Sequence, residues 1–456
     1  MRKIMFVLVA VAMVAPLAVA ELQNVEVGGS LRIRGNWYFN EVNAWDDSVG
    51  NDIKFVEQRT RLNVKADFTD SVCAFIELDS YDTWGQDFRS NYITGVDRAA
   101  ATADDVEVYQ SYVQADEMWG QPLSLRVGRQ ELALGSQWLV GVNDTSSLYT
   151  GLSFDGVRLT YATDMVSIDA FTAKLAELSP LEQDGDVDLY GVYGSYLGVE
   201  DMTFDAYWLF VRDARGLVPL CPLKDWDVTT LHTIGLRAAG NVAAFDFEAE
   251  VAYQFGNADR LGPLTTANVF ERWDGTDVDA FGGNAEVGYT FDMQMTPRLF
   301  VGAAYLEGAE DDALAFNRLF SNWEYSEFLD ATELSNAWVF RAGASAMPTE
   351  NVELMLCGAY MLPEEALETR VHFWPWETED LDDELGWELG LYGTYNYSED
   401  LTFEAGWSHF FTGEGVSKDN FHRFIGNYVV NNGFATAVGT DDDDADYLFL
   451  QTKICF

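Results

Sequence analysis

The stretch FDFEAEVAYQF, residues 245–255, decides the fold because apolar and polar side chains alternate along it. One face carries the apolar side chains of Phe245, Phe247, Ala249, Val251, Tyr253 and Phe255. The other face carries Asp246, Glu248, Glu250 and Gln254. A β-strand places successive side chains on opposite faces, whereas a helix needs apolar residues three and four apart. The stretch therefore predicts a β-strand with one apolar face and one polar face.

The same alternation recurs along the whole chain, for example in LRIRGNWYFN at 31–40, FVEQRTRLNVKADF at 55–68 and LGWELGLYGTYNY at 385–397. It delimits about 18 strands, an even number that is typical of bacterial outer-membrane barrels. The predicted strands are 28–40, 53–69, 71–84, 105–116, 121–131, 153–163, 165–174, 186–197, 201–212, 231–241, 243–256, 281–292, 298–309, 335–347, 350–362, 383–398, 400–411 and 446–456.

The links between the predicted strands alternate in length. Tight polar turns are expected near 69–71, 163–164, 198–200, 240–241, 348–349 and 398–400, and the links between them are much longer. Short periplasmic turns alternating with long extracellular loops are typical of a transmembrane barrel, and a soluble sandwich has no reason to keep that order. We therefore predict an all-β fold: residues 21–456 form a single transmembrane antiparallel β-barrel.

Residues 1–20, MRKIMFVLVAVAMVAPLAVA, have the three parts of a secretory signal peptide. Arg2 and Lys3 supply the basic start, an apolar run follows, and Ala18-Val19-Ala20 is a small-residue cleavage site. We expect the mature chain to begin at Glu21, with an uncleaved membrane anchor as the alternative. Export permits disulfides, but the four cysteines lie without motif spacing, and we assign them no chemistry: Cys73, Cys221, Cys357 and Cys455.

The chain ends in YLFLQTKICF, whose apolar residues alternate up to Phe456. This pattern predicts the closing strand of a barrel, ending in an aromatic residue that the β-barrel assembly machinery reads. Closure is obligatory because lipid offers no partner for an open sheet edge. Aromatic residues near strand ends predict girdles at the interfaces with lipid and lipopolysaccharide, with ordinary core packing as the alternative: Trp37, Phe39, Tyr253, Phe255, Trp387, Tyr397 and Trp407.

Composition excludes several classes of protein. The 456 residues include 75 Asp and Glu against 27 Lys and Arg, a net charge of -48, which argues against binding a nucleic acid through bulk charge. A hydrophobic content of 48% and an aromatic content of 14% exclude a disordered acidic chain. Beyond the leader, no apolar run reaches the roughly 18 residues of a membrane helix. A helical membrane protein is therefore excluded as well.

Several segments together resemble the alginate-export family of outer-membrane porins. The most specific is LRVGRQEL at 125–132, within VYQSYVQADEMWGQPLSLRVGRQELALGSQWLV, followed by LSFDGVRLTY and preceded by LRIRGNWY and RTRLNVKADF. Weaker similarities are EAEVAYQFGNADR at 248–260 and ELSNAWVFRAGAS at 333–345. The resemblance implies a monomeric barrel of eighteen strands with an arginine-rich, carboxylate-balanced constriction that passes an anionic polysaccharide. The acidic loops depart from that pattern.

Selectivity in a wide barrel is set by charged side chains on its lumenal face. By strand parity the candidates are Arg32, Arg34, Arg59, Arg61, Lys65, Arg126, Arg158, Arg237 and Arg341, and Arg129 is added by the family motif alone. Arg126 and Arg129 have opposite parity, so Arg129 requires a bulge or a register change. The balancing carboxylates are Glu57, Asp67, Asp246, Glu248 and Glu250. We expect these arginines to favour anions, with mere bracing of the wall as the alternative.

Enzymatic readings find little support in the sequence. His232, His372, His409 and His422 lack metal-ligand spacing, and no HExxH, GxSxG or Walker pattern occurs. We therefore expect no cofactor and no catalytic centre, although a barrel hydrolase with a Ser/His pair stays open. The expected function is passive passage of anionic saccharides or small organic anions. Nonspecific diffusion and a non-conducting structural or adhesive barrel are the alternatives.

Overall fold

The computed structural model describes residues 22–39, 52–69, 71–85, 90–91, 96–97, 106–144, 150–177, 186–214, 228–258, 276–308, 313–329, 334–364, 368–373, 376–380, 384–413 and 444–456. The predicted signal peptide, Cys221 and the acidic runs at 310–312 and 441–443 lie outside the described residues. Within the described ranges, no helix has the length and apolar character needed to cross a membrane.

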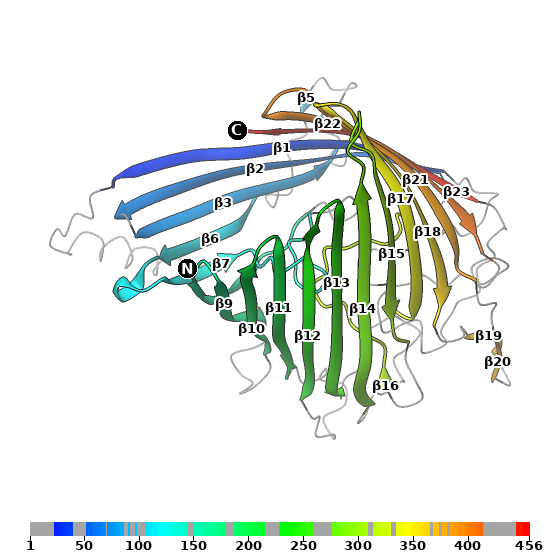
Figure 1. Cartoon of the computed structure of the whole chain (residues 1–456), viewed down its shortest axis with the longest axis horizontal. Helices are drawn as coiled ribbons and strands as arrows, with labels where there is room; N and C mark the ends of the chain where they lie inside the picture. Colours follow the sequence, from blue (N-terminus) through cyan, green and yellow to red (C-terminus); the bar gives the residue numbers. More distant parts are fainter. Residues whose placement is uncertain are drawn as a thin grey trace.

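Eighteen long strands among the described residues form one closed antiparallel sheet (Figure 1). The first nine are β1 (Asn24–Phe39), β2 (Ile53–Thr69), β3 (Val72–Thr83), β6 (Glu107–Ala115), β7 (Leu123–Gln130), β8 (Phe154–Ala162), β9 (Val166–Ala176), β10 (Val187–Val199) and β11 (Met202–Asp213). The others are β12 (Thr229–Val242), β13 (Phe245–Ala258), β14 (Thr276–Thr290), β15 (Arg298–Leu306), β17 (Ala337–Thr349), β18 (Val352–Pro363), β21 (Gly386–Asn396), β22 (Leu401–Thr412) and β23 (Ala445–Cys455).

Five short strands and one helical turn are additional to this sheet or attached to it. They are β4 (Ser90–Asn91), β5 (Val96–Asp97), β16 (Ala313–Leu314), β19 (Glu368–Phe373), β20 (Trp376–Asp380) and the 3₁₀ turn η2 (Met118–Gly120). Only β16 joins the large sheet, where it pairs in parallel with β14. The predicted all-β antiparallel barrel is therefore confirmed, strand for strand.

The predicted alternation of short and long links is also present, although two turns lie further along the chain than expected. Residues 240–241 belong to β12 and residues 348–349 to β17, so the actual turns are at 243–244 and 350–351. Ala243 has a positive φ of 56°. Left-handed backbone at alanine is uncommon and carries no sequence signal, so the sequence favours a turn at the preceding Gly-Asn pair.

The sheet closes where the two ends of the chain meet. β23 pairs with β1 from Ser30 to Phe39, so neither strand has an open edge. Beyond the ladder, Phe456 and Gly29 exchange two backbone hydrogen bonds of 3.0 and 2.9 Å. A Cβ atom at Gly29 would lie 2.4 Å from the Arg61 carbonyl oxygen and 2.9 Å from the Phe456 ring. Glycine is therefore required where the closing strand crosses β1.

The two faces of the wall are the reverse of those in a soluble protein. On β13, the outward Val251 and Tyr253 are 43% and 39% exposed, whereas the inward Glu250 and Gln254 are 4% and 0% exposed. Apolar side chains on the outside meet lipid, and polar side chains inside pair with one another. Of the predicted girdle residues, Trp37 is half-buried. The other six lie exposed on the outward face: Phe39, Tyr253, Phe255, Trp387, Tyr397 and Trp407.

Candidate functional site in the barrel lumen

Two long links fold into the lumen and pack against each other. We call residues 131–144, which follow β7, the first inward segment, and residues 313–329, which follow β15, the second inward segment. Their backbones pair in parallel at Val140 and Phe320. The Trp138 indole, which is fully buried, donates a hydrogen bond of 2.8 Å to the Tyr325 hydroxyl. In Figure 1 these segments are the cyan and yellow-green coils inside the sheet.

The inward segments are held by a compact apolar cluster rather than by regular structure. Trp138 stacks on Phe316 with ring centroids 5.6 Å apart, and Leu139 packs in the same cluster. Apolar side chains from the wall complete it: Phe154, Phe171, Leu189, Leu209, Leu306 and Val339. Burial of this apolar surface fixes two irregular segments across the lumen. Sequence analysis missed this feature, because strand alternation carries no information about where a long link folds.

The first inward segment ends at a cluster of two arginines and one aspartate. Arg32 on β1 and Arg59 on β2 are direct cross-strand neighbours, so two positive charges face each other. The Asp144 carboxylate accepts hydrogen bonds from both guanidinium groups, at 2.9 Å from Arg32 and 2.5 Å from Arg59. Burial alone would raise the pKa of Asp144, but its bond to Arg59 and the nearby arginine charges hold it below the ordinary value.

Arg61 anchors the start of the same segment. Its guanidinium lies 2.9 Å from Asp79 and 3.6 Å from Glu131, and it stacks on the Tyr109 ring at 3.8 Å. Burial raises the pKa of the Glu131 carboxyl, although the Tyr109 hydroxyl and Arg61 oppose that shift. The predicted residues Arg32, Arg59 and Arg61 are thus brought together around one loop that the sequence did not place.

The far wall, from β8 to β17, pairs its arginines directly with carboxylates on neighbouring strands. Arg237 lies 2.7 Å from Asp205 and 3.0 Å from Glu248. Glu250 accepts hydrogen bonds from Tyr207 at 2.8 Å and from Ser136 of the first inward segment at 3.1 Å. Three more pairs complete this wall: Arg158 with Asp169 at 2.8 Å, Arg341 with Glu286 at 2.6 Å, and Arg298 with Asp246 and Glu286.

Three cations have a different environment. Arg34 bonds to Asn36 at 3.0 Å and to the Tyr447 hydroxyl at 2.7 Å, and its guanidinium lies 3.8 Å from the Phe449 ring. Arg126 bonds to the Gln114 amide oxygen at 2.8 Å. In the part of the chain that the structure describes, neither arginine nor Lys453 on β23 has a carboxylate at salt-bridge distance.

Lys65 and Arg126 line a cavity of about 450 Å³ near the short-turn end of the barrel. Lys65 is exposed in this cavity and lies 3.2 Å from Asp67, so this predicted pair is a solvated one. Glu57, another predicted carboxylate, accepts a bond of 2.7 Å from the Asn36 amide and is buried beside Arg34. An amide therefore separates the opposite charges of Arg34 and Glu57, which the sheet places directly across from each other.

The lumenal placement of Arg129 was wrong. β7 pairs with β8 in continuous register from Leu123 to Gln130, so there is no bulge to turn Arg129 inward. It shares its face with Val127, which is 45% exposed, whereas the neighbouring Gln130 is buried. Arg129 lies on the outer face and forms an exposed pair with Asp155 at 2.7 Å. Strand parity was the better guide here than the family motif.

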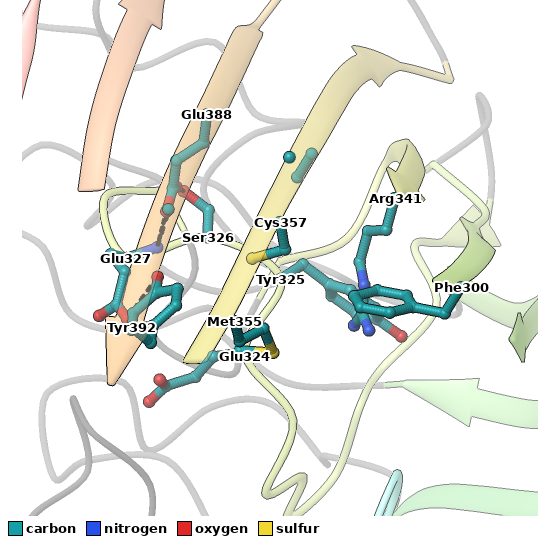
Figure 2. A pocket seen from close by; sticks show the side chains of 13 residues that line it. Phe300, Glu324, Tyr325, Ser326, Glu327, Arg341, Met355, Cys357, Glu388 and Tyr392 are labelled. Carbon is teal, nitrogen blue, oxygen red and sulfur yellow. Dashed lines mark hydrogen bonds between the residues drawn. The ribbon is translucent and has the colours of Figure 1, made fainter. Parts of the chain in front are cut away.

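A second cavity, of about 270 Å³, lies between the second inward segment and β15, β17, β18 and β21 (Figure 2). Glu388 on β21 is buried and accepts hydrogen bonds from the Ser326 hydroxyl at 2.7 Å and the Glu327 backbone at 3.1 Å. Figure 2 shows Glu327 beside Tyr392, whose hydroxyl donates to the Glu327 carboxylate at 3.2 Å. This side of the lumen is acidic, and Glu388 fastens the segment to the wall.

The described residues contain neither a metal-binding cluster nor a disulfide. Among the described residues, no cluster of three or more His, Cys, Asp and Glu could hold a metal ion. Cys73, Cys357 and Cys455 are free thiols.

A closed barrel with an apolar outer face and a charged lumen narrowed by inward segments defines a channel of the outer membrane. The family model for alginate export matches residues 23–423, and the chain belongs to this family. A search of curated proteins gave no significant match.

The fold is similar to that of several solved structures. OccAB3 of Acinetobacter baumannii has a TM-score of 0.55 at 11% identity, with 94% of this chain and 99% of that chain covered. OccK8 (OprE) of Pseudomonas aeruginosa has a TM-score of 0.54 at 12% identity, with coverages of 95% and 98%. Likeness at this level of identity shows the shared barrel architecture over nearly the whole chain.

Proposed function

We propose that the channel passes small organic anions or anionic saccharides and favours anions despite its acidic composition. The observation that carries this proposal is the cationic wall formed by β1, β2 and β23. Arg32, Arg34 and Arg59 lie there side by side; Asp144 bonds to Arg32 and Arg59, and Arg34 is held by the neutral Asn36 and Tyr447. Arginine stays charged at every working pH and presents a planar fork to carboxylates.

Proximity decides selectivity, because salt screens charges beyond a Debye length of about 8 Å at physiological ionic strength. A permeating anion that sheds part of its water beside Arg34 feels a less screened field than one at the mouth. The wall therefore outweighs the net charge of -48.

Bracing alone and nonspecific diffusion are the competing functions. Direct pairs such as Arg237 with Asp205 favour bracing on the far wall, because each positive charge there is matched. The amide-separated charges of Arg34 and Glu57 favour selectivity on the near wall, because these two opposite charges do not neutralise each other by direct contact. A hydrolase has no support from the family or the fold. We also propose that the channel has two partners in the membrane, lipopolysaccharide and the β-barrel assembly machinery.

The test is the reversal potential across a salt gradient in a planar bilayer. The parent protein is expected to prefer anions, and Asp144→Asn is expected to increase that preference because Arg32 and Arg59 lose their shared counter-charge. Arg129→Gln is the matched control, since it removes a charge from the outer face. Cation preference in the parent, or an equal shift in the two variants, would reject anion selectivity.

A further inference from the structure

A third cavity, of about 250 Å³, lies where both inward segments approach the closing strands. It is lined from β1, β21, β22 and β23, and it shares Glu327 and Tyr392 with the acidic cavity of Figure 2. Pockets for drug-sized ligands begin at about 300 Å³. The cavity therefore suits a solute of monomer size better than an extended oligomer.

One side of this cavity presents cations. Arg34 is 1% exposed overall and is positioned by Asn36, Tyr447 and the Phe449 ring, all of which are neutral. Lys453 lies directly across the β1–β23 ladder from Arg32, half-buried. The direct partners of this buried guanidinium are neutral, and the Glu327 carboxylate of the same cavity acts on it through space. A ligand carboxylate that reaches Arg34 would therefore add a direct charged contact that the protein itself does not make.

The other side presents two carboxylates, Glu327 and Glu404. Gln451 accepts a hydrogen bond from Arg32 at 2.7 Å and donates one to Glu404 at 2.5 Å. Its neutral amide thus lies between the Glu404 carboxylate and the Arg32 guanidinium, which also bonds to Asp144. Glu327 is oriented by the Tyr392 hydroxyl at 3.2 Å. Opposite charges therefore persist on the two sides of one small cavity.

We propose that this cavity binds zwitterionic solutes of amino-acid size, which carry one carboxylate and one ammonium group. The carboxylate pairs with Arg34 and Lys453, and the ammonium pairs with Glu327 and Glu404. A simple anion gains only the first contact and is repelled by the two glutamates, whereas a zwitterion gains both. This inference rests on the proposed passage of solutes through the lumen, and it adds to the proposed anions a class of net-neutral solutes whose carboxylate is recognised by the same cationic wall.

The test compares three radiolabelled solutes of similar size in proteoliposomes: L-alanine as the zwitterion, lactate as the anion and glycerol as the neutral control. Parent protein is expected to pass alanine about 25-fold faster than glycerol, roughly fivefold for each of the two partly exposed charged contacts that alanine gains. Glu404→Gln keeps an acceptor for the Gln451 amide and removes only the charge. It is expected to lower alanine passage about fivefold and to leave lactate passage equal or faster.

Lys453→Gln is the complementary variant and is expected to slow alanine and lactate together. Folding of each variant is checked by the shift in gel migration on heating. Alanine passage equal to that of glycerol, or an equal loss of alanine and lactate in Glu404→Gln, would overturn the zwitterion site. A different outcome separates the two proposals: the reversal potential shows no anion preference, but alanine passage is still fast and sensitive to Glu404→Gln. That outcome would overturn the proposed anion selectivity and support the zwitterion site.

Discussion

The near wall (β1, β2 and β23) and the far wall (β8 to β17) use the same residue type in two ways. On the far wall, Arg237 and Arg341 contact carboxylates on neighbouring strands directly, at 2.7 and 2.6 Å. On the near wall, Arg32 and Arg59 both contact Asp144 of an inward segment, Arg34 bonds to neutral groups, and Gln451 lies between Arg32 and Glu404. The comparison shows that an inward arginine is not by itself a selectivity residue: its partners decide whether it braces the wall or acts on a solute.

The largest expected effect is the loss of a far-wall brace. Arg237→Ala leaves the buried Asp205 carboxylate without its cation, and breaking such a buried pair costs about 3–5 kcal/mol. Urea unfolding of the barrel in lipid vesicles measures this loss. Arg129→Ala is the control, because its pair with Asp155 is exposed and contributes at most about 1 kcal/mol. Equal destabilisation in both variants would show that Arg237 is no brace.

The next effect concerns the inward segments. Trp138→Ala removes a fully buried side chain from the cluster that holds both segments, and such a truncation costs about 3–5 kcal/mol. The wall strands keep their ladders, so the barrel should still form. Single-channel conductance is expected to rise as the segments leave the lumen. Unchanged conductance in a folded variant would show that the segments do not narrow the pathway.

Much of this architecture could be predicted from alternation alone, because lipid outside and polar groups inside impose a period of two on every strand. Parity even corrected the family motif at Arg129. The inward segments could not be predicted, since the apolar residues of 131–144 and 313–329 have no period and their partners lie far apart in the sequence. For that reason the sequence did not single out Asp144 and Glu327, which lie on the inward segments. It did not single out Glu404 and Lys453 because a single charged residue on a strand has no distinguishing pattern.

A smaller effect follows from pH. The arginines lower the pKa of Asp144 below the ordinary 3.8, so its stabilising contribution is complete above that value and is lost as pH falls through the lowered pKa. Protonation also removes the counter-charge of Arg32 and Arg59. Anion preference, measured by reversal potential from about pH 7 to about pH 3, should therefore increase only at the acidic end. Asp144→Asn should lack this increase. An increase already near neutral pH would contradict the assignment to Asp144.

The central claim is that unmatched cations on the lumenal face set selectivity and that matched pairs do not. Its most direct test is the reversal potential of two double variants measured beside the parent. Arg126→Gln/Lys453→Gln removes two cations that have no carboxylate at salt-bridge distance among the residues that the structure describes. Arg158→Gln/Asp169→Asn removes one matched pair and leaves the net charge unchanged. We predict that the first variant loses anion preference and that the second keeps it. Equal reversal potentials in the two variants would contradict the claim.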